Sequence, residues 1–151
     1  MKTFRSILTL IAVVLFSSAT MAQTAKVQIV HNSADIISET VDVYVNGEMF
    51  INDLDFREAT RFIEVPAGVD LNVEVMPQPD DFEIIETKWE QTYNLESGES
   101  YILIANGLLS PEKYDPFQPF DIYPFAGARE EAMSSPTGPT TDVLVFHGST
   151  D

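Results

Sequence analysis

The chain has 151 residues, of which 24 are acidic and 8 are lysine or arginine, so its formal net charge is −16. A surface this acidic repels the phosphates of nucleic acids and of anionic lipids, which excludes nucleic-acid binding from the expected functions. The chain has no cysteine, which also excludes disulfides, thiolate nucleophiles and cysteine-ligated zinc.

Residues 1–22 have the layout of a secretory signal peptide. Lys2 and Arg5 precede the apolar run 7–16, and small residues then lead to Ala22, where we expect cleavage. The run is about half of the roughly 20 residues that a membrane-spanning helix needs, and no later stretch could span a bilayer. We therefore expect an exported protein that is secreted, held at the cell surface or released into the periplasm.

Residues 23–126 have the pattern of one domain built from short strands. The predicted strands are 26–31, 41–45, 48–51, 60–65, 69–76, 83–95, 100–105 and 120–125. Asn46-Gly47 is expected to form a hairpin turn because both residues tolerate positive φ, and the polar segment 52–59 is expected to be a crossing loop. No segment keeps a helical period, so the predicted fold class is an all-β, antiparallel β-sandwich of about seven to eight strands.

The opening of this domain is repeated at the end of the chain. Residues 27–35 read VQIVHNSAD and residues 143–151 read VLVFHGSTD, so each is an apolar strand that runs into His-x-Ser-x-Asp. The two copies lie one domain length apart, which is too far for a solenoid repeat. We therefore expect 127–141, a segment rich in small polar residues and proline, to be an interdomain linker. Residues 142–151 would be the first strand of a second, truncated repeat.

A family resemblance rests on several motifs in a fixed order. They are VHNSAD at 30–35, VDVYVNG at 41–47, VPAG at 65–68 and Ala-Asn-Gly at 105–107. Together they resemble the DUF4397 family, a domain of unknown function that is common in exported bacterial proteins and often present in tandem. The resemblance implies an immunoglobulin-like exported module and no particular reaction. The family's usual Ser-Pro-Asp-Ala-Pro is Ser-Ala-Asp-Ile-Ile here, so two prolines that would stiffen the loop are absent.

His31, Ser33 and Asp35 have the residue types of a hydrolytic triad. In an extended strand, however, residues two apart lie roughly 6.5 Å apart along the axis, so a direct bond between His31 and Ser33 needs a sharp turn. We therefore expect no catalysis at this position. The trio is either a structural element at the end of the first strand or a binding site, and both alternatives stay open.

Loop carboxylates are the other candidate ligands. Asp80, Asp81 and Glu83, and separately Asp53 and Asp55, could hold calcium through oxygen, although neither group has the spacing of a helix-loop-helix calcium site. Solvated loops are the alternative. Aromatic residues at 114, 117, 120 and 123 could stack on sugar rings or anchor a long loop to the core.

These patterns predict a non-catalytic exported β-sandwich module, either a structural spacer or a binding unit, in a tandem-repeat cell-surface or secreted protein. Its expected partner is a further repeat domain after Asp151. The alternative is a carbohydrate- or calcium-binding accessory domain of a secreted enzyme, with glycans or cell-surface proteins as partners. Apart from calcium, no cofactor is expected.

Overall fold

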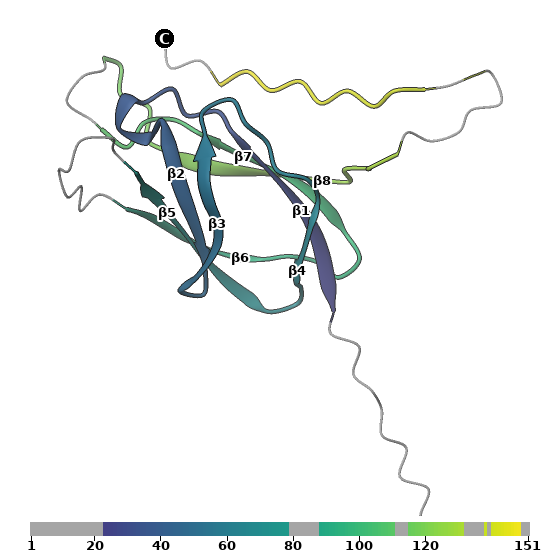
Figure 1. Ribbon diagram of the computed structural model, residues 1–151. Coiled ribbons are helices and arrows are strands. Elements are labelled where there is room, and N and C mark those ends of the chain that lie inside the picture. Colours follow the sequence, from purple (N-terminus) through teal and green to yellow (C-terminus); the bar gives the residue numbers. More distant parts are fainter. Residues whose placement is uncertain (1–22, 79–87, 111–114, 132–137, 139, 149–151) are drawn as a thin grey trace, which may run out of the picture.

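The computed structural model describes residues 23–78, 88–110, 115–131, 138 and 140–148 (Figure 1). The predicted signal peptide, residues 1–22, lies outside the described residues. The strands are β1 (Thr24–His31), β2 (Thr40–Val45), β3 (Glu48–Asp55), β4 (Ile63–Pro66), β5 (Asp70–Pro77), β6 (Trp89–Asn94), β7 (Ser100–Asn106) and β8 (Asp121–Ala126), and a short 3-10 helix η1 spans Ile36–Ser38. None of the described segments is a helix long and apolar enough to cross a membrane.

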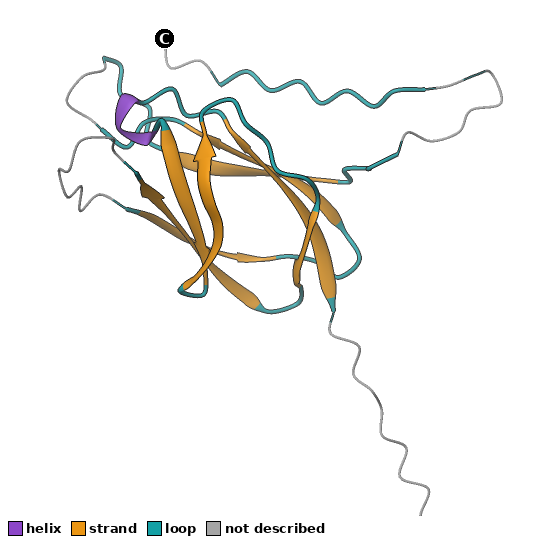
Figure 2. Cartoon of the chain, viewed as in Figure 1, coloured by secondary structure: helices purple, strands orange, loops and turns teal. Residues whose placement is uncertain are grey.

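The strands form two four-stranded sheets, with the orders β4-β1-β7-β8 and β3-β2-β5-β6. The sheets face each other as a sandwich (Figure 2), which confirms the predicted fold class. One correction applies to the antiparallel arrangement, because β1 pairs in parallel with β7, from Lys26 opposite Ser100 to His31 opposite Ala105. A parallel pair needs a long crossover connection. Here the chain supplies it by building the whole second sheet between the two strands.

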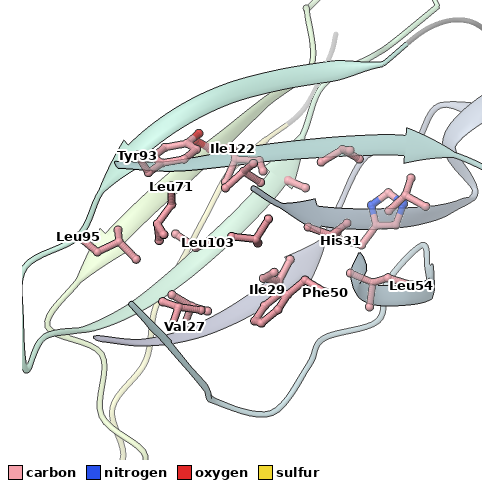
Figure 3. A pocket seen from close by; sticks show the side chains of 17 residues that line it. Val27, Ile29, His31, Phe50, Leu54, Leu71, Tyr93, Leu95, Leu103 and Ile122 are labelled. Carbon is pink, nitrogen blue, oxygen red and sulfur yellow. The ribbon is translucent and has the colours of Figure 1, made fainter. Parts of the chain in front are cut away.

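The core lies between the inward faces of the two sheets, and strand alternation accounts for it. In β5, Leu71, Val73 and Val75 are buried while Asn72 and Glu74 between them are half-buried on the outer face. Each fully buried aliphatic side chain of this kind stabilises the fold by about 1.5–3 kcal/mol. The two inner faces leave a small apolar cavity of about 30 Å³ between them (Figure 3).

The predicted hairpin is confirmed, and its turn has the expected backbone geometry. Asn46 has φ 52° and Gly47 has φ 78°, which is the pair of positive angles that matches the twist of a two-residue hairpin. The Asn46 side chain also accepts a hydrogen bond from the backbone N–H of Asn72, at 2.9 Å. The turn is thereby tied to the start of β5.

The crossing loop expected at 52–59 begins later than predicted, because β3 continues to Asp55. The pairing of β2 with β3 shifts register on either side of Val43, and Asp53 takes a positive φ of 53°. The backbone N–H of Asp53 donates to the buried carboxylate of Asp42, at 2.9 Å. This side chain therefore supplies the acceptor that the irregular ladder lacks.

The other predicted strands are observed with shifted ends. The segment predicted at 60–65 forms a strand only from Ile63, because Thr60 instead bonds to Ile29 of β1 through both its backbone N–H and its hydroxyl. The strand predicted at 83–95 is observed as β6 from Trp89, and residues 79–87 lie outside the described residues.

The end of the described chain runs along the outside of the sandwich, as the yellow segment in Figure 1. Residues 140–148 have no strand assignment, and residues 149–151 lie outside the described residues. Val143 and Val145 are 78% and 84% exposed. The strand predicted at 142–151 is therefore not paired in the described residues 142–148, and the second repeat stays a prediction.

Candidate functional site

The His-x-Ser-x-Asp trio lies where β1 ends and the chain turns toward η1. His31 and Ser33 are 0% exposed and Asp35 is 1% exposed. Because β1 and β7 are parallel, their carboxyl ends meet at the same edge of the sheet, so the residues after β1 lie beside the residues after β7. The trio is therefore placed inside the protein, between two strand ends.

The loop after β3 closes over His31. The backbone N–H of His31 donates to the carbonyl of Glu58 at 2.9 Å, and its carbonyl accepts from the N–H of Arg57 at 2.8 Å. The Phe56 ring meets the imidazole edge to face, with 6.2 Å between the ring centres. The imidazole also reaches the wall of the core cavity (Figure 3). Solvent is therefore kept from the ring on several sides.

Hydrogen bonds determine which nitrogen of the His31 imidazole carries the proton. Its Nδ1 accepts from the backbone N–H of Ser33 at 3.4 Å, so the proton is on Nε2, which donates to the carbonyl of Ser38 at 2.7 Å. Burial lowers the pKa of His31 below its ordinary value of 6.5, although the bond to Ser38 and the charge of Asp55 oppose the shift. His31 is therefore neutral at neutral pH.

The hydroxyl of Ser33 is hydrogen-bonded to a backbone carbonyl and to a second hydroxyl. It donates to the carbonyl of Gly107 at 2.7 Å and lies 2.9 Å from the hydroxyl of Ser38. Since the Ser33 proton goes to Gly107, Ser38 is the donor in the pair of hydroxyls. The Asp35 carbonyl, at 3.3 Å, is a second and more distant acceptor for the Ser38 proton. Both ring nitrogens of His31 have other partners, so the imidazole does not hold the Ser33 hydroxyl as a general base would.

The carboxylate of Asp35 joins the loop to the chain after β7. One oxygen accepts from the backbone N–H groups of Leu109 and Ser110, at 2.8 and 2.6 Å, and the Ser110 hydroxyl bonds to both oxygens at 2.7 and 2.8 Å. The other oxygen caps η1 through the N–H of Ile37, at 3.3 Å. Charge-assisted bonds of this kind are the strong ones.

We call His31, Ser33, Asp35 and Ser38 the buried loop lock. In the described residues no buried side-chain nitrogen or oxygen lacks a hydrogen-bond partner, so this group has no polar atom left over for a substrate. The lock can hold two strand ends together. It has neither an exposed nucleophile nor an exposed acid.

Sequence reasoning missed the partners of the trio, namely Ser38, Gly107 and Ser110. A signal existed for Gly107, because a glycine directly after a strand often marks a close backbone approach. Its φ is 97°, and a Cβ at this position would lie 2.3 Å from the carbonyl oxygen of Pro119. No local pattern pointed to Ser110, which is 75 residues from Asp35.

The predicted calcium ligands Asp80, Asp81 and Glu83 fall in 79–87, outside the described residues, so this prediction stays as it was. Among the residues that are described, no group of three or more histidine or acidic side chains could hold a metal ion.

Asp53 and Asp55, the second pair of carboxylates, already have protein partners. The Thr40 hydroxyl donates to Asp55 at 2.6 Å, and the Asn52 amide bonds to the carboxylate of Asp53. They lie on β3 and are exposed. Their local role is therefore to hold the edge of the sheet.

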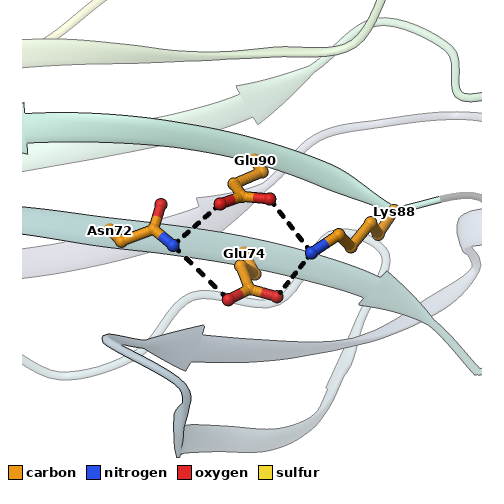
Figure 4. Close-up of polar contacts among 4 residues, drawn as sticks. All are labelled: Asn72, Glu74, Lys88 and Glu90. Atoms are coloured by element: carbon orange, nitrogen blue, oxygen red, sulfur yellow. Dashed lines mark hydrogen bonds and ion pairs between the residues drawn. The ribbon is translucent and has the colours of Figure 1, made fainter.

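A polar cluster on the outer face of the second sheet is also internally paired (Figure 4). Lys88 contacts Glu74 at 3.1 Å and Glu90 at 3.0 Å, and the Asn72 amide donates to Glu90 at 2.9 Å. The hydrogen bond from Lys88, followed by that from Asn72, lowers the pKa of Glu90. The cluster joins β5 to β6 across the surface.

The aromatic residues expected to anchor a loop or to stack on sugars separate into two kinds. Phe120 is buried and meets the edge of Trp89 with 5.4 Å between ring centres, so it anchors the chain to the core. Phe117 and Tyr123 are each 40% exposed. The residue at 114 lies outside the described residues.

Comparison with known proteins adds one assignment. The family model described as "Domain of unknown function (DUF4397)" matches residues 25–117, which is more than half of the chain and includes the buried loop lock. No curated protein matches the sequence. The chain therefore belongs to the DUF4397 family.

Proposed function

We propose that the chain is a non-catalytic, exported β-sandwich module that serves as a structural spacer in a tandem-repeat cell-surface or secreted protein. The observation that carries the proposal is the burial of the trio. His31, Ser33 and Asp35 have the residue types of an active site, yet all of them bond inside the protein. A group that joins strand ends contributes to rigidity, which a spacer requires.

Two features of the sequence support the remaining parts of the proposal. The layout of residues 1–22 supports export. The second His-x-Ser-x-Asp at the end of the chain supports a tandem arrangement. A net charge of −16 suits a protein that stays in solution or projects from a surface without binding to anionic lipids.

The experiment compares Ser33→Ala with Ser97→Ala, an exposed serine in the turn before β7. We expect Ser33→Ala to lower the free energy of unfolding by about 1–3 kcal/mol, since the Gly107 carbonyl and the Ser38 hydroxyl lose a partner. Ser97→Ala should leave it within about 0.5 kcal/mol. Wild type and both variants should show no turnover on ester, amide and glycoside substrates.

Turnover in the wild type that Ser33→Ala abolishes would contradict the proposal. Calorimetry with calcium and a glycan array test the accessory-domain alternative on the same samples. A saturable signal with either would favour a binding domain over a spacer.

A further inference from the structure

We propose that Asn106 and the outer face of β8 form a docking surface for a following module of the same family, whose first strand begins at Val143. The proposal rests on the tandem arrangement proposed above and goes beyond it. It states where the next module sits and that its orientation is fixed by contacts rather than left to a free linker.

The tail is held by contacts that involve its backbone and its rings. The Phe146 ring lies against Tyr123 and Phe125 of β8, with 5.5 and 6.0 Å between ring centres. The side-chain amide of Asn106 donates to the carbonyl of Gly148 at 3.1 Å. Ring contacts in this range stabilise beyond the area they bury. The tail is therefore seated against the outer face of β8 and the end of β7.

Asn106 connects equivalent positions of the two sequence copies. Its amide oxygen accepts from the Asn32 side chain at 2.7 Å, and its amide nitrogen donates to Gly148. Asn32 and Gly148 are the same position in VHNSAD and FHGSTD. Asn106, at the end of β7, thus bonds to the residue that follows the first strand of the first module. It also bonds to the residue that would occupy the same position in the second module.

The difference between the copies at this position has a steric reason. A Cβ at Gly148 would lie 2.4 Å from a ring carbon of Phe146 and 2.6 Å from the amide oxygen of Asn106. A side chain there would therefore force the Phe146 ring or the Asn106 amide, the two groups that hold the tail, to move. The glycine fits a position where the backbone must approach Asn106 closely.

The exposed side of the tail matches the buried side of β1. Val27 and Ile29 lie in the core of the first module, whereas their counterparts Val143 and Val145 are exposed to solvent. The alternate residue Phe146 is the one that contacts β8. The stripe of side chains that β1 turns into its own core is thus turned outward in the tail. A second sandwich that uses this tail as its first strand would bury Val143 and Val145 in its own core. The exposed stripe therefore identifies the occupant of the docking surface as a following module of the same family.

The linker is tied down as well. Arg129 makes two hydrogen bonds to the carboxylate of Asp142, at 2.7 and 2.6 Å, and Lys26 at the start of β1 forms an ion pair with Glu130. All four side chains are near half-exposed, so each pair is worth little by itself. One pair links the start of the linker to β1, and the other links the start of the linker to the residue that follows its end.

The test is backbone ¹⁵N relaxation of residues 143–148 in wild type and in Gly148→Asn, which installs the residue of the first copy. His147→Asn is the matched control, because His147 is an exposed neighbour. We expect sandwich-like order in wild type and in the control, and loss of order in Gly148→Asn. Trp89 fluorescence should stay unchanged in all three, which shows that the sandwich is folded. A tail that is mobile in wild type, or still ordered in Gly148→Asn, would overturn the proposal.

The occupant is tested separately. Small-angle scattering of the chain extended through the residues that follow Asp151 should fit one relative orientation of two modules. In Gly148→Asn the scattering should instead require a range of relative orientations. A stop codon after Asp151, or dimers of the present chain that bury Val143 and Val145, would overturn the occupant. Turnover in the assays of the preceding section would instead count against the spacer function while leaving this surface in place.

Discussion

The carboxylate of Asp35 accepts a 2.6 Å hydrogen bond from the backbone N–H of Ser110, 75 residues later in the chain. The contact depends on the parallel pairing of β1 with β7, since only then do the segments that follow both strands leave the sheet at the same edge. The crossover between these strands contains the whole second sheet. Asp35 therefore joins the segment that follows β1 to the segment that follows β7, although the whole second sheet lies between them in the sequence.

The first prediction concerns Asp35 itself. In Asp35→Asn one acceptor oxygen becomes an NH₂ group that faces the N–H groups of Leu109 and Ser110 or the Ser110 hydroxyl. We expect a loss of about 1.5–3 kcal/mol in the free energy of unfolding. Urea denaturation followed by Trp89 fluorescence measures it, because Trp89 packs on the core residue Phe120.

Asp70→Asn is the control for this substitution. Asp70 is exposed and accepts one bond from the Asn94 amide at 3.1 Å, which an asparagine oxygen can also accept. We expect a change within about 0.5 kcal/mol. Equal losses in the two variants would mean that burial of Asp35 contributes nothing specific.

The second prediction is a pH dependence that comes from His31. Burial lowers the pKa of His31 in the folded protein below 6.5, so the unfolded chain binds a proton at a pH where the folded chain does not. Stability contributed by this group is complete above about pH 6.5 and falls as the pH falls below it. The slope attributable to one proton is at most about 1.4 kcal/mol per pH unit.

Urea denaturation between about pH 7.5 and 5.5 measures this slope. We expect the slope to be smaller in His31→Gln, which cannot take up the proton. An NMR titration of the His31 imidazole in a His147→Gln background, where it is the only imidazole, reports the pKa directly. A folded-state value above 6.5 would contradict the burial argument.

Local patterns predicted much of this fold. Alternation in β5 placed Leu71, Val73 and Val75 together on one face, and they are all buried. Asn46-Gly47 marked the hairpin through its own backbone preferences. Such features depend on neighbours a few residues away, which is why a sequence displays them.

Non-local contacts explain what the patterns did not predict. The alternation of β2 places Asp42 on the outer face, yet it is buried because the bulge at Asp53 and the side chain of Gln78 cover it. The trio His31, Ser33 and Asp35 was recognised from residue types. A structural role at the end of β1 was one of the two alternatives that these residue types left open. The partners of the trio after β7 were not predicted, because they lie 74 or 75 residues further along the chain.

The third prediction concerns the Asp42 carboxylate. It accepts from the N–H of Asp53 at 2.9 Å and from the Gln78 amide at 2.6 Å. Asp42→Ala leaves the bulge N–H without a partner, so we expect a loss of about 1–3 kcal/mol in the free energy of unfolding. Asp42→Asn should cost less, because its amide oxygen still accepts and the Gln78 amide can turn over. The reverse order, measured by urea denaturation, would show that charge rather than acceptor geometry matters here.

The last prediction separates two costs of replacing Gly107, namely the strain of a positive φ and the steric clash with Pro119. In Gly107→Ala the new Cβ would lie 2.3 Å from the carbonyl oxygen of Pro119, and the residue keeps a φ of 97°. Gly98→Ala also has a positive φ, 78°, but meets no atom within 4 Å. The backbone conformation alone costs about 1–2 kcal/mol, which is the loss of stability we expect for Gly98→Ala. For Gly107→Ala we expect a larger loss, since the clash adds to it and moves the carbonyl that accepts from Ser33. If thermal and urea denaturation gave the same loss for both variants, Gly107 would be needed for its φ alone, and the close approach of Pro119 would not matter for stability.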